Sequence, residues 1–419
     1  MAYDLQKTLL KDAFLAAVEA VQPHHFMTDV AAEVTSRFGT KPVTLFALGK
    51  AAGAMAEAYL ATGAPVAKGI VVLPHHVQAT LPEPFTLYHS AHPVPDDASQ
   101  QAGEALLAAA AALGPDDAAI LLLSGGGSAL ACVPPAPISL AEKQEVNQAL
   151  LASGAPIQEM NIVRKHLSLF KGGRLAAASF PAPLLCFALS DVPGDEATAI
   201  ASGPAVADPS SRQEAAAILE KYDIETSDNV RNWLANPASE SPFIGDDTLA
   251  MSDYHLIGSA TIALSAAARI VEAAGYHPVM LGDHFQDNAR DLANWMAAEA
   301  ENYPDGTALI SGGETSVKVT GTGRGGRNAE FAHALALHNN PRLIALSGDS
   351  DGIDGADNVA ASLIAPDTMS RAEAASLDIK SMLDNNDSHG FFAALSDQLI
   401  TGPTQTNVND IRIILIGTP

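Results

Sequence analysis

The stretch AILLLSGGGS at residues 119–128 decides the fold, because a short apolar run is followed at once by three glycines between two serines. A run of this length bounded by turn residues is typical of a buried strand. Similar runs recur along the chain, and segments with helical spacing, such as Asp97–Leu113 and Thr261–Ala274, lie between many of them. This alternation of strands and helices predicts an α/β fold with mostly parallel sheets.

The strand positions also indicate where function should lie. In open α/β folds, ligands bind beyond the carboxyl ends of the strands, so the loop after each strand matters most. Besides Ala119–Leu123, the expected strands are Val43–Leu48, Gly69–Leu73, Phe85–Ser90, Leu184–Leu189, His255–Ile257, Pro278–Leu281, Ala308–Ser311, Ser316–Val319, Leu343–Leu346 and Ile411–Ile416.

The composition favours a folded, acidic protein. Among 419 residues, 48 are Asp or Glu and 23 are Lys or Arg, which gives a formal net charge of −25. Such an excess repels nucleic acid and anionic membranes, so we expect neither as a partner. Hydrophobic residues make up 47% of the chain and charged residues only 17%, which argues against disorder. No apolar stretch approaches the ~18 residues of a spanning helix, and a cytoplasmic location is expected.

A boundary between two domains is expected near residue 240. The segment NPASESPFIGDD at Asn236–Asp247 is the least patterned of the chain and is rich in proline, serine and acidic residues. We therefore expect domains at residues 1–240 and 241–419. An amphipathic helix expected near the N-terminus, with Leu5, Leu9 and Phe14 on one face, could pack on either domain.

Two loops of the first half have the composition of anion-binding loops. Lys50 follows a strand and Gly49, where its ammonium group could reach a helix N-terminus; the alternative is a solvated lysine. The glycines of Ser124–Ser128 let the backbone approach a ligand, and their N–H groups could bind phosphate; the alternative is a tight turn.

An acidic loop and a basic window complete the first half. Asp191 and Asp195 follow a strand and could hold Mg²⁺ or accept a proton from a hydroxyl, although turn chemistry alone could explain them. The window Arg164–Arg174 holds four basic residues, whereas an average window of this chain would hold about 0.6. This indicates a placed positive patch, with a solvated basic face as the alternative.

Glycine loops follow strands in the second half too. Ser311–Thr315 is one, and Gly321–Asn328 is another, followed by a helix expected from near Ala329. The second loop formally matches G-x-G-x-x-G, but the preceding strand carries Lys318, and only Asp349 is available as the later acid of a dinucleotide site. Its two arginines instead suggest neutralisation of a phosphate or carboxylate.

The remaining candidates are weaker. Ser347–Gly355 gathers carboxylates suited to a hard cation but does not match an EF-hand, and Thr401–Asp410 offers hydroxyls and amides before the last strand. The histidines lack metal-binding spacing. Cys132 and Cys186 form no C-x-x-C pair, so both are expected to be buried and reduced.

Taken together, these loops resemble the glycerate 2-kinase family, in which the C-terminal half is called the MOFRL domain. The resemblance covers nearly the whole chain, and one mild departure is Ser350, where threonine is expected. The motifs that carry it are residues 47–51 (ALGKA), 92–96 (HPVPD), 123–130 (LSGGGSAL), 161–166 (NIVRKH), 171–175 (KGGRL), 189–195 (LSDVPGD), 325–330 (GGRNAE), 351–355 (DGIDG) and 401–407 (TGPTQTN).

The resemblance implies ATP- and Mg²⁺-dependent phosphorylation of D-glycerate at its 2-hydroxyl, giving 2-phosphoglycerate and ADP, by two Rossmann-like domains that face a central cleft. Phosphoryl transfer depends on positioning and positive charge. The expected catalytic residues are Lys50, Arg327 and Asp191; the nucleotide-binding residues are Ser124, Gly125, Gly126, Gly127, Ser128, Gly312, Gly313, Glu314, Gly325 and Gly326; Arg164, Lys165 or Arg174 would hold the glycerate carboxylate; and Asp195 and Asp351 would lie near Mg²⁺.

Two other functions compete with this hypothesis. Members of the family are also named hydroxypyruvate reductases, which would require NAD(P). A non-catalytic anion sensor would bind its ligand without turnover. The oligomeric state, with a homodimer among the options, does not follow from the sequence.

Overall fold

The computed structural model describes residues 3–355 and 357–419, and these form two compact units. The N-terminal unit comprises Pro23–Ser190 and Asp195–Ile257. The C-terminal unit comprises Met1–Gln22, Asp191–Gly194 and Gly258–Pro419. Each unit contains one six-stranded sheet. None of the described helices is long and apolar enough to cross a membrane.

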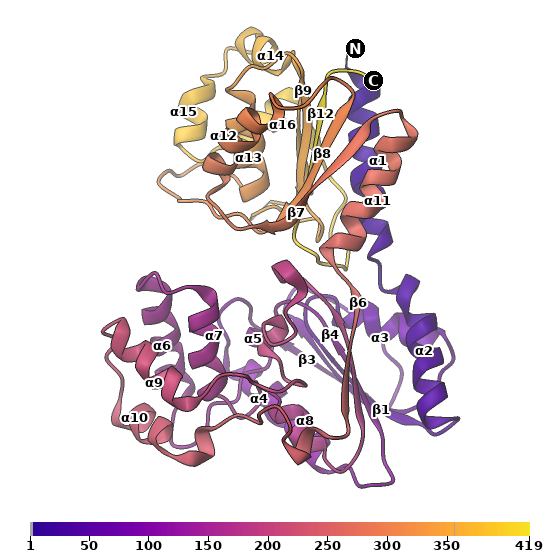
Figure 1. Cartoon of the computed structure of the whole chain (residues 1–419), viewed down its shortest axis with the longest axis vertical. Helices are drawn as coiled ribbons and strands as arrows, with labels where there is room; N and C mark the ends of the chain where they lie inside the picture. The colour runs from indigo at the N-terminus through magenta and orange to yellow at the C-terminus, as the bar shows by residue number, and fades with distance from the viewer. Residues whose placement is uncertain (1–2, 356) are drawn as a thin grey trace. The chain divides into compact units, whose positions relative to one another are not determined.

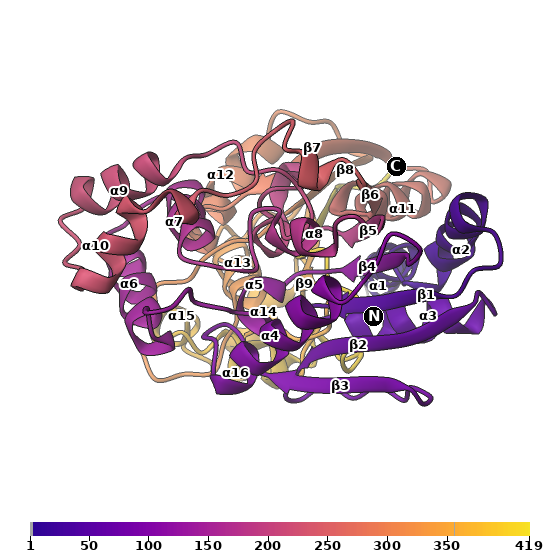
Figure 2. The same cartoon turned by 90° about the horizontal axis from the view of Figure 1, so that it is seen from below.

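The sheet of the N-terminal unit has the strand order β3-β2-β1-β4-β5-β6. Strands β1 to β5 pair with their neighbours in parallel, and Figure 2 shows β1, β2 and β3 side by side. The central strands β1, β4 and β5 are buried throughout, as expected for apolar runs in a parallel sheet. The strands are β1 (Val43–Leu48), β2 (Val66–Pro74), β3 (Phe85–Ser90), β4 (Ala119–Leu123), β5 (Leu184–Leu189) and β6 (Ser252–Gly258).

Helices of this unit cover the sheet and form a separate helical group. Helix α3 packs on β1 and β2, and α4 packs on β3 and α8. Helices α6, α7, α9 and α10 share their own apolar core, which includes Val146, Val163 and Leu219. The bounds are α2 (His24–Phe38), α3 (Ala52–Ala61), α4 (Asp97–Ala111), α5 (Gly127–Leu130), α6 (Leu140–Ala152), α7 (Ile157–His166), α8 (Arg174–Ser179), α9 (Arg212–Lys221) and α10 (Asp228–Ala235).

The sheet of the C-terminal unit has the order β11-β10-β9-β12-β8-β7. Strands β7 and β8 are parallel, whereas β12 runs antiparallel to both β8 and β9, and β10 runs antiparallel to β9 and β11. Strands β7, β8, β9 and β11 therefore point one way, and β10 and β12 the other. The strands are β7 (His277–Phe285), β8 (Thr307–Gly313), β9 (Leu343–Asp349), β10 (Ala361–Ile364), β11 (Gln398–Leu399) and β12 (Asp410–Ile416).

Helices lie on both faces of this sheet. Figure 1 shows α1 and α11 on one face and α12, α13, α15 and α16 on the other. The apolar core on the second face includes Phe331, Phe391 and Phe392. The bounds are α1 (Asp4–Ala20), α11 (Ala260–Ala273), α12 (Ala289–Ala300), α13 (Arg327–Ala336), α14 (Thr368–Ala374), α15 (Ile379–Asp384) and α16 (Ser388–Leu395).

The α/β class with two sheets is confirmed, and the strands β1 to β5 of the N-terminal sheet are parallel as predicted. In the C-terminal sheet only β7 and β8 pair in parallel, and the other neighbouring strands are antiparallel. One predicted strand is wrong. Ser316–Val319 forms no strand, and only an isolated bridge joins Ser316 to Asn288. Val319 is 74% exposed and Lys318 is also exposed, and of the apolar side chains in this segment only Val317 packs against the core. Strands β10 and β11 were not predicted, because they are only four and two residues long.

The two units divide the chain at other positions than the predicted boundary. Asn236–Asp247 lies inside the N-terminal unit, and the chain passes to the C-terminal unit after Ile257, at the end of β6. Helix α1 belongs to the C-terminal unit, where it packs on α11 and β9. The functional domains at 1–240 and 241–419 stay a prediction.

Candidate functional site

In the N-terminal unit, the loops after β1 and β4 lie against each other. The N–H of Ser124 donates to the carbonyl of Leu48 (3.0 Å), and the N–H of Lys50 donates to the carbonyl of Gly125 (2.9 Å). The buried Ser124 hydroxyl accepts from the N–H of Ala51 (3.0 Å). The carboxyl ends of adjacent parallel strands meet at one sheet edge, so the predicted Lys50 and Ser124–Ser128 loops are neighbours.

Glycines allow this close approach. Gly49 has φ +132°, and a Cβ there would lie 2.2 Å from the Ser124 hydroxyl oxygen. Gly126 has φ +82°, and a Cβ there would lie 3.3 Å from Cγ of Lys50. The Lys50 side chain therefore passes directly beside Gly126. Gly126 and Ser128 are partly exposed, whereas Gly125 and Gly127 are buried.

Lys171 is a site residue that the sequence did not single out, although it lies in the predicted basic window. It is buried, and its Nζ donates to the carbonyl oxygen and the hydroxyl (3.0 Å) of Ser128. The Ser128 hydroxyl also lies 2.9 Å from the hydroxyl of Ser202. The basic window and the glycine loop are thus in direct contact.

Two of the predicted carboxylate-binding residues are occupied by internal partners. Lys165 forms a buried ion pair with Asp208, with 2.5 Å between Nζ and Oδ1. The guanidinium of Arg174 donates to the carbonyls of Ser239 and Glu240, both at 2.9 Å. The charged groups of Lys165 and Arg174 are thus already engaged by other groups of the protein.

Arg164 differs from these two residues. Its guanidinium donates to the side-chain oxygens of Asn147 and Asn161, both at 3.3 Å, and both acceptors are neutral. Burial lowers its pKa. Of the three predicted residues, Arg164 has the charge least satisfied by the contacts that the structure gives.

Asp195 belongs to the N-terminal unit and lies in a 3₁₀ turn after β5, with φ +56°. Burial and then the charges of Cys186, Asp195 and Glu196 raise the pKa of Tyr254. Asp195 therefore lies within electrostatic range of Tyr254. The other predicted metal residue, Asp351, belongs to the C-terminal unit.

In the C-terminal unit, Arg327 is the centre of a carboxylate network. Its Nε lies 2.7 Å from Asp410 Oδ1, its Nη2 lies 2.7 Å from Asp349 Oδ2, and its Nη1 lies 3.3 Å from Glu314 Oε1. Burial alone would lower the pKa of Arg327, but the three carboxylates raise it. The guanidinium is permanently charged and held by three elements of the unit.

Asp410, which holds Arg327, is itself fixed at the start of β12. It is buried and accepts from Arg412, from the N–H of Thr315 (3.1 Å) and from the Asn328 side chain (2.7 Å). Burial alone would raise its pKa, but Arg412 and Arg327 lower it, so the carboxylate is charged. The sequence did not predict this role for Asp410, because its partners lie about 80 or more residues away.

The Gly325–Gly326 loop brings Arg327 to the start of α13. Asp354 accepts from the N–H groups of Asn328 (3.0 Å) and Ala329 (2.8 Å). A Cβ on Gly326 would lie 2.3 Å from the Asp354 carboxyl carbon, so this carboxylate needs the glycine. Asp354 therefore fixes the first turn of the helix that carries Arg327.

The G-x-G-x-x-G loop is held by side chains rather than by a preceding strand. The Asn386 side chain accepts from the N–H groups of Thr320 (2.8 Å) and Gly321 (2.9 Å), and Asp387 accepts from the N–H of Arg324 (3.1 Å). This is not the strand–turn–helix arrangement of a dinucleotide fingerprint.

The other predicted glycines lie at the end of β8. Gly313 has φ +113°, and a Cβ there would lie 2.2 Å from the carbonyl oxygen of Phe285. The Gly312 carbonyl accepts from Arg412 (2.9 Å). Glu314, which follows, has a side chain that is 53% exposed. Glu314 is thus the predicted residue here that a ligand can reach most easily.

Asp191 lies in the same unit as Arg327. The Asn407 side chain donates to Asp191 Oδ2 (3.3 Å), and the Asn409 side chain donates to its carbonyl. The carbonyl of Asn409 accepts from the N–H of Ser350 (3.0 Å), next to Asp349. The Thr401–Asp410 segment thus connects Asp191 to the carboxylates around Arg327.

Asp351 lies beside Asp349 in this network. Its N–H donates to Asp349 Oδ1 (3.0 Å). Burial, and then the charge of Asp351, raise the pKa of Asp349 well above its usual value. Two neighbouring carboxylates, one of them buried, fit the oxygen ligands that a divalent cation prefers.

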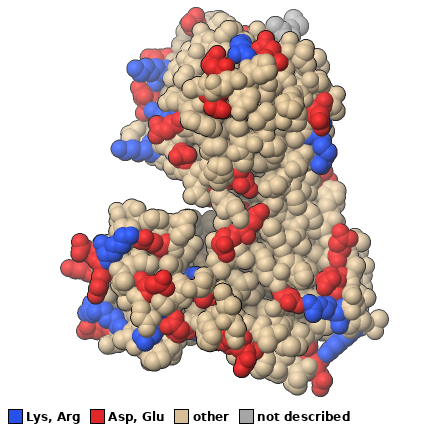
Figure 3. Space-filling view, in the orientation of Figure 1, with Lys and Arg blue, Asp and Glu red and all other residues tan. Residues whose placement is uncertain are grey.

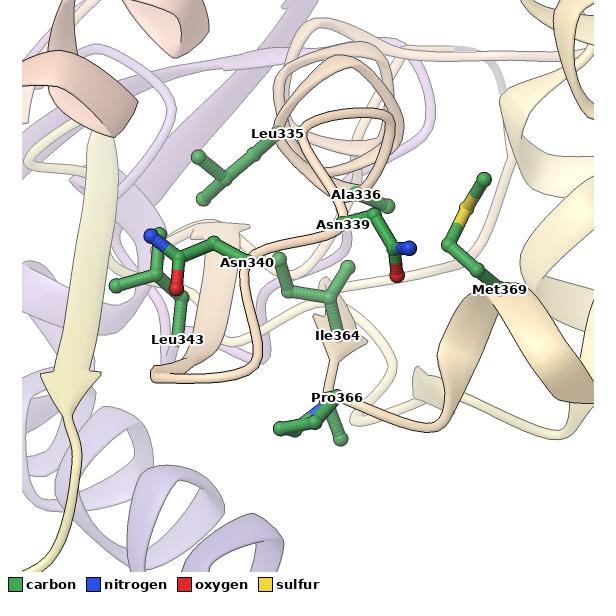
Figure 4. Close-up of a pocket in the computed structure, with 9 residues that line it drawn as sticks. Leu335, Ala336, Asn339, Asn340, Leu343, Ile364, Pro366 and Met369 are labelled. Atoms are coloured by element: carbon green, nitrogen blue, oxygen red, sulfur yellow. The ribbon is translucent and has the colours of Figure 1, made fainter.

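A small pocket elsewhere in the C-terminal unit is not part of this site. Figure 4 shows Leu335 and Asn339, at the far end of α13, facing Leu343 and Ile364. Arg327 lies at the opposite end of α13. Because of this position, the pocket has no place in the chemistry of the network.

The charged side chains on the face drawn in Figure 3 do not gather into a basic patch. Figure 3 shows acidic and basic side chains scattered over the visible face of each unit, with neutral areas between them. Lys165 and Lys171 are buried, and Arg164 and Arg174 are partly buried. The basic window of the sequence is therefore an interior feature.

Two family models match the chain. The family described as "Domain of unknown function (DUF4147)" matches residues 9–235, and the MOFRL family matches residues 307–410. The glycine loop after β4 lies in the first match, and Arg327 and Asp410 lie in the second.

Known proteins resemble the chain over its full length. A D-glycerate 2-kinase of Thermotoga maritima is 37% identical, with 98% of both chains covered. A relative from Agrobacterium vitis, provisionally named a hydroxypyruvate reductase, is 43% identical over 88% of this chain and 86% of its own. The crystal structure of a Thermotoga maritima glycerate kinase superimposes with a TM-score of 0.88 at 36% identity, covering 99% of this chain and all of the other.

Proposed function

This chain belongs to the glycerate 2-kinase family, and we propose on that basis that it transfers the terminal phosphoryl group of ATP to the 2-hydroxyl of D-glycerate. The products would be 2-phosphoglycerate and ADP. The observation that carries the proposal is the full-length similarity to a D-glycerate 2-kinase, in which the glycine loops and the Arg327 network are included. Phosphoryl transfer needs positioned charge more than covalent chemistry, and both units supply it.

In the N-terminal unit, we assign phosphate binding to the Gly125–Ser128 loop and Lys50. The loop exposes Gly126 and Ser128, and the Lys50 stem lies beside Gly126. Backbone N–H groups and an ammonium group are suitable donors to phosphate oxygens. Ser124 acts indirectly, because its hydroxyl is occupied by the N–H of Ala51.

In the C-terminal unit, we assign charge stabilisation to Arg327 and proton acceptance to Asp191. A guanidinium held by carboxylates keeps one orientation and needs no reorganisation as charge develops. Asp191 is partly exposed, and its Oδ2 accepts from Asn407. A carboxylate in such a position can accept the proton that the 2-hydroxyl loses as it attacks phosphorus.

Mg²⁺ is proposed as the metal of the reaction. Asp351 and Asp349 fit it, because their mutual repulsion would be relieved by a cation. Bound Mg²⁺ would neutralise phosphate charge. Asp195 stays a second predicted ligand, and Gly312, Gly313 and Gly325 stay predicted nucleotide contacts. The glycerate carboxylate is assigned to Arg164 in preference to Lys165 and Arg174. Lys165 is paired with Asp208, and the charges of Asp208 and Glu240 act on Arg174, whereas Arg164 contacts neutral acceptors.

The experiment is ADP release by the purified chain. We expect release that requires both D-glycerate and Mg²⁺, with L-glycerate as the matched control. A second assay follows NADH and NADPH absorbance with hydroxypyruvate, which the name of the Agrobacterium relative suggests. ADP release in the first assay with no change of absorbance in the second supports the proposed kinase activity. Oxidation of NADH or NADPH without ADP release would overturn it. The cytoplasmic location and a homodimer stay predictions.

A further inference from the structure

Lys171 is a buried lysine with an unusual set of partners. Only 2% of it is exposed, and its Nζ donates to the carbonyl and the hydroxyl of Ser128. Ser128 in turn contacts the hydroxyl of Ser202, which is also buried. The ammonium group, two hydroxyls and one carbonyl thus form a compact polar array in the N-terminal unit.

Among the described residues, the structure gives Lys171 no carboxylate partner, and its Nζ donates only to neutral groups of Ser128. Burial has the largest effect and lowers its pKa to about 7; Cys132 has the next largest effect and raises it, and Lys143 and Arg164 lower it. Lys143 is also buried, and its Nζ donates to the carbonyl of Leu167. By contrast, the buried Lys165 lies 2.5 Å from the carboxylate of Asp208. Buried cations are costly without an anionic partner, so this array is electrostatically incomplete.

The backbone is strained where it brings Ser202 to the array. Ala201 and Ser202 have φ of +49° and +61°, which is unfavourable for residues with a Cβ. The carbonyl of Ser202 accepts from the N–H of Gly172 (3.0 Å), directly after Lys171. The strained turn and the basic window are therefore joined by a backbone hydrogen bond, and this bond helps to position Ser202.

The array is open on the side of the glycine loop. Ser128 and Gly126 are partly exposed, and the Lys50 stem passes beside Gly126. A ligand that contacts the Ser128 hydroxyl therefore lies close to the Lys171 ammonium group, which donates to the same hydroxyl.

We propose that Lys171, Ser128 and Ser202 form the floor of an anion-binding subsite that takes one carboxylate or phosphoryl group of a small ligand. The partly exposed Ser128 hydroxyl donates to the anion, the buried Ser202 hydroxyl donates to Ser128, and Lys171 supplies the balancing charge. The subsite itself follows from these contacts. Its assignment to a reactant, either the glycerate carboxylate or a nucleotide phosphate, rests on the proposed kinase function.

The test compares the full-length chain with its Lys171→Met, Ser202→Ala and Lys221→Met variants. Lys221 is an exposed lysine of the same unit, paired with Glu159, and is the matched control. Binding of D-glycerate, ADP and inorganic phosphate is measured by titration calorimetry, and folding is checked by thermal unfolding. We expect Lys171→Met to weaken the binding of at least one of these anions 10-fold or more. Ser202→Ala should weaken the binding of the same anion, and Lys221→Met should leave the affinity for all three unchanged.

The arms of the experiment identify the anion. A loss confined to D-glycerate assigns the carboxylate, and a loss confined to ADP and phosphate assigns the nucleotide. Wild-type affinity for all three probes in folded Lys171→Met and Ser202→Ala would overturn the proposal. Because binding is measured without turnover, a chain that lacks kinase activity but shows these losses would refute the proposed function and keep the subsite.

Discussion

At the scale of single residues, the two units surround a cationic side chain in different ways, as Arg327 and Lys171 show. Arg327 is held by three carboxylates, whereas the Lys171 ammonium group donates to the neutral carbonyl and hydroxyl of Ser128. A guanidinium in a fixed carboxylate frame is oriented before the ligand arrives. For a lysine without such a frame, the anionic ligand supplies the balancing charge. Arg327 should therefore affect mainly the rate of transfer, and Lys171 mainly affinity.

Arg327→Gln should lower kcat by about 100-fold or more, because a preorganised donor to developing charge is lost. Arg327→Lys should restore little, since a single ammonium cannot contact Asp410 and Asp349 in the same way. Initial rates with D-glycerate and ATP measure the effect. Arg342→Gln, at the amino-terminal side of β9, removes an arginine paired with Asp305 and should leave kcat unchanged. Equal losses in both variants would contradict the role of Arg327.

The affinity for the anion at Lys171 should fall as the pH rises from about 7 to 9. The pKa of Lys171 is about 7 in the free protein, so the ammonium loses its proton in this range. Burial is the main cause of this low pKa; of the charged groups that act on Lys171, Cys132 raises its pKa and Lys143 and Arg164 lower it. KM for the affected reactant, measured across this range, should rise in the wild type and stay high and nearly constant in Lys171→Met. A flat wild-type profile would count against a charged Lys171 in binding.

At the scale of elements, the start of α13 links the fold to the site. Asp354 accepts from two N–H groups of its first turn, and Gly326 leaves room for that carboxylate. Arg327 is the first residue of the helix. The position of the guanidinium thus depends on a contact made from another loop.

Asp354→Ala should reduce both stability and turnover. Loss of two buried hydrogen bonds to a carboxylate costs about 2 kcal/mol or more, which urea unfolding measures. Displacement of Arg327 should lower kcat more than it raises KM. Ser211→Ala removes the cap of α9 and is the matched control, expected to cost about 1 kcal/mol and to leave kcat unchanged. Normal kcat in a destabilised Asp354→Ala would contradict the positioning role.

The sequence predicted the elements well wherever a strand was apolar. The expected bounds of β1, β3, β4 and β5 match the structure. Three of these strands, β1, β4 and β5, are buried apolar runs with clear turn residues after them. Ser316–Val319 failed because Lys318 and Val319 remain exposed, so little burial favours a strand there. The loops of Lys50 and Ser124–Ser128 were predicted to bind anions at strand ends, and the structure places them together.

At the scale of the whole molecule, what could not be predicted depends on distant pairing. Strand β12 inserts between β8 and β9, so Asp410 meets Arg327 although 83 positions separate them. The contact of Lys171 with Ser128 spans 43 positions and depends on the strained turn at Ser202. Spacing along the chain does not reveal such contacts.

The negative net charge of the chain is compatible with anionic substrates, because a small ligand meets local basic groups. The net charge is −25, whereas Lys171, Lys165 and Arg327 lie in polar networks with little or partial exposure. A small anion meets these local groups. A broad basic face for a polyanion is not what the visible surface of either unit presents.

The most direct test of the central claim is the position of the phosphate in the product. The purified chain is incubated with D-glycerate, ATP and Mg²⁺, and the product is identified by ³¹P and ¹H NMR spectroscopy. We predict a single phosphomonoester on carbon 2, formed together with an equal amount of ADP. Phosphate on carbon 3, or no phosphorylated glycerate under conditions in which the chain is folded, would contradict the account.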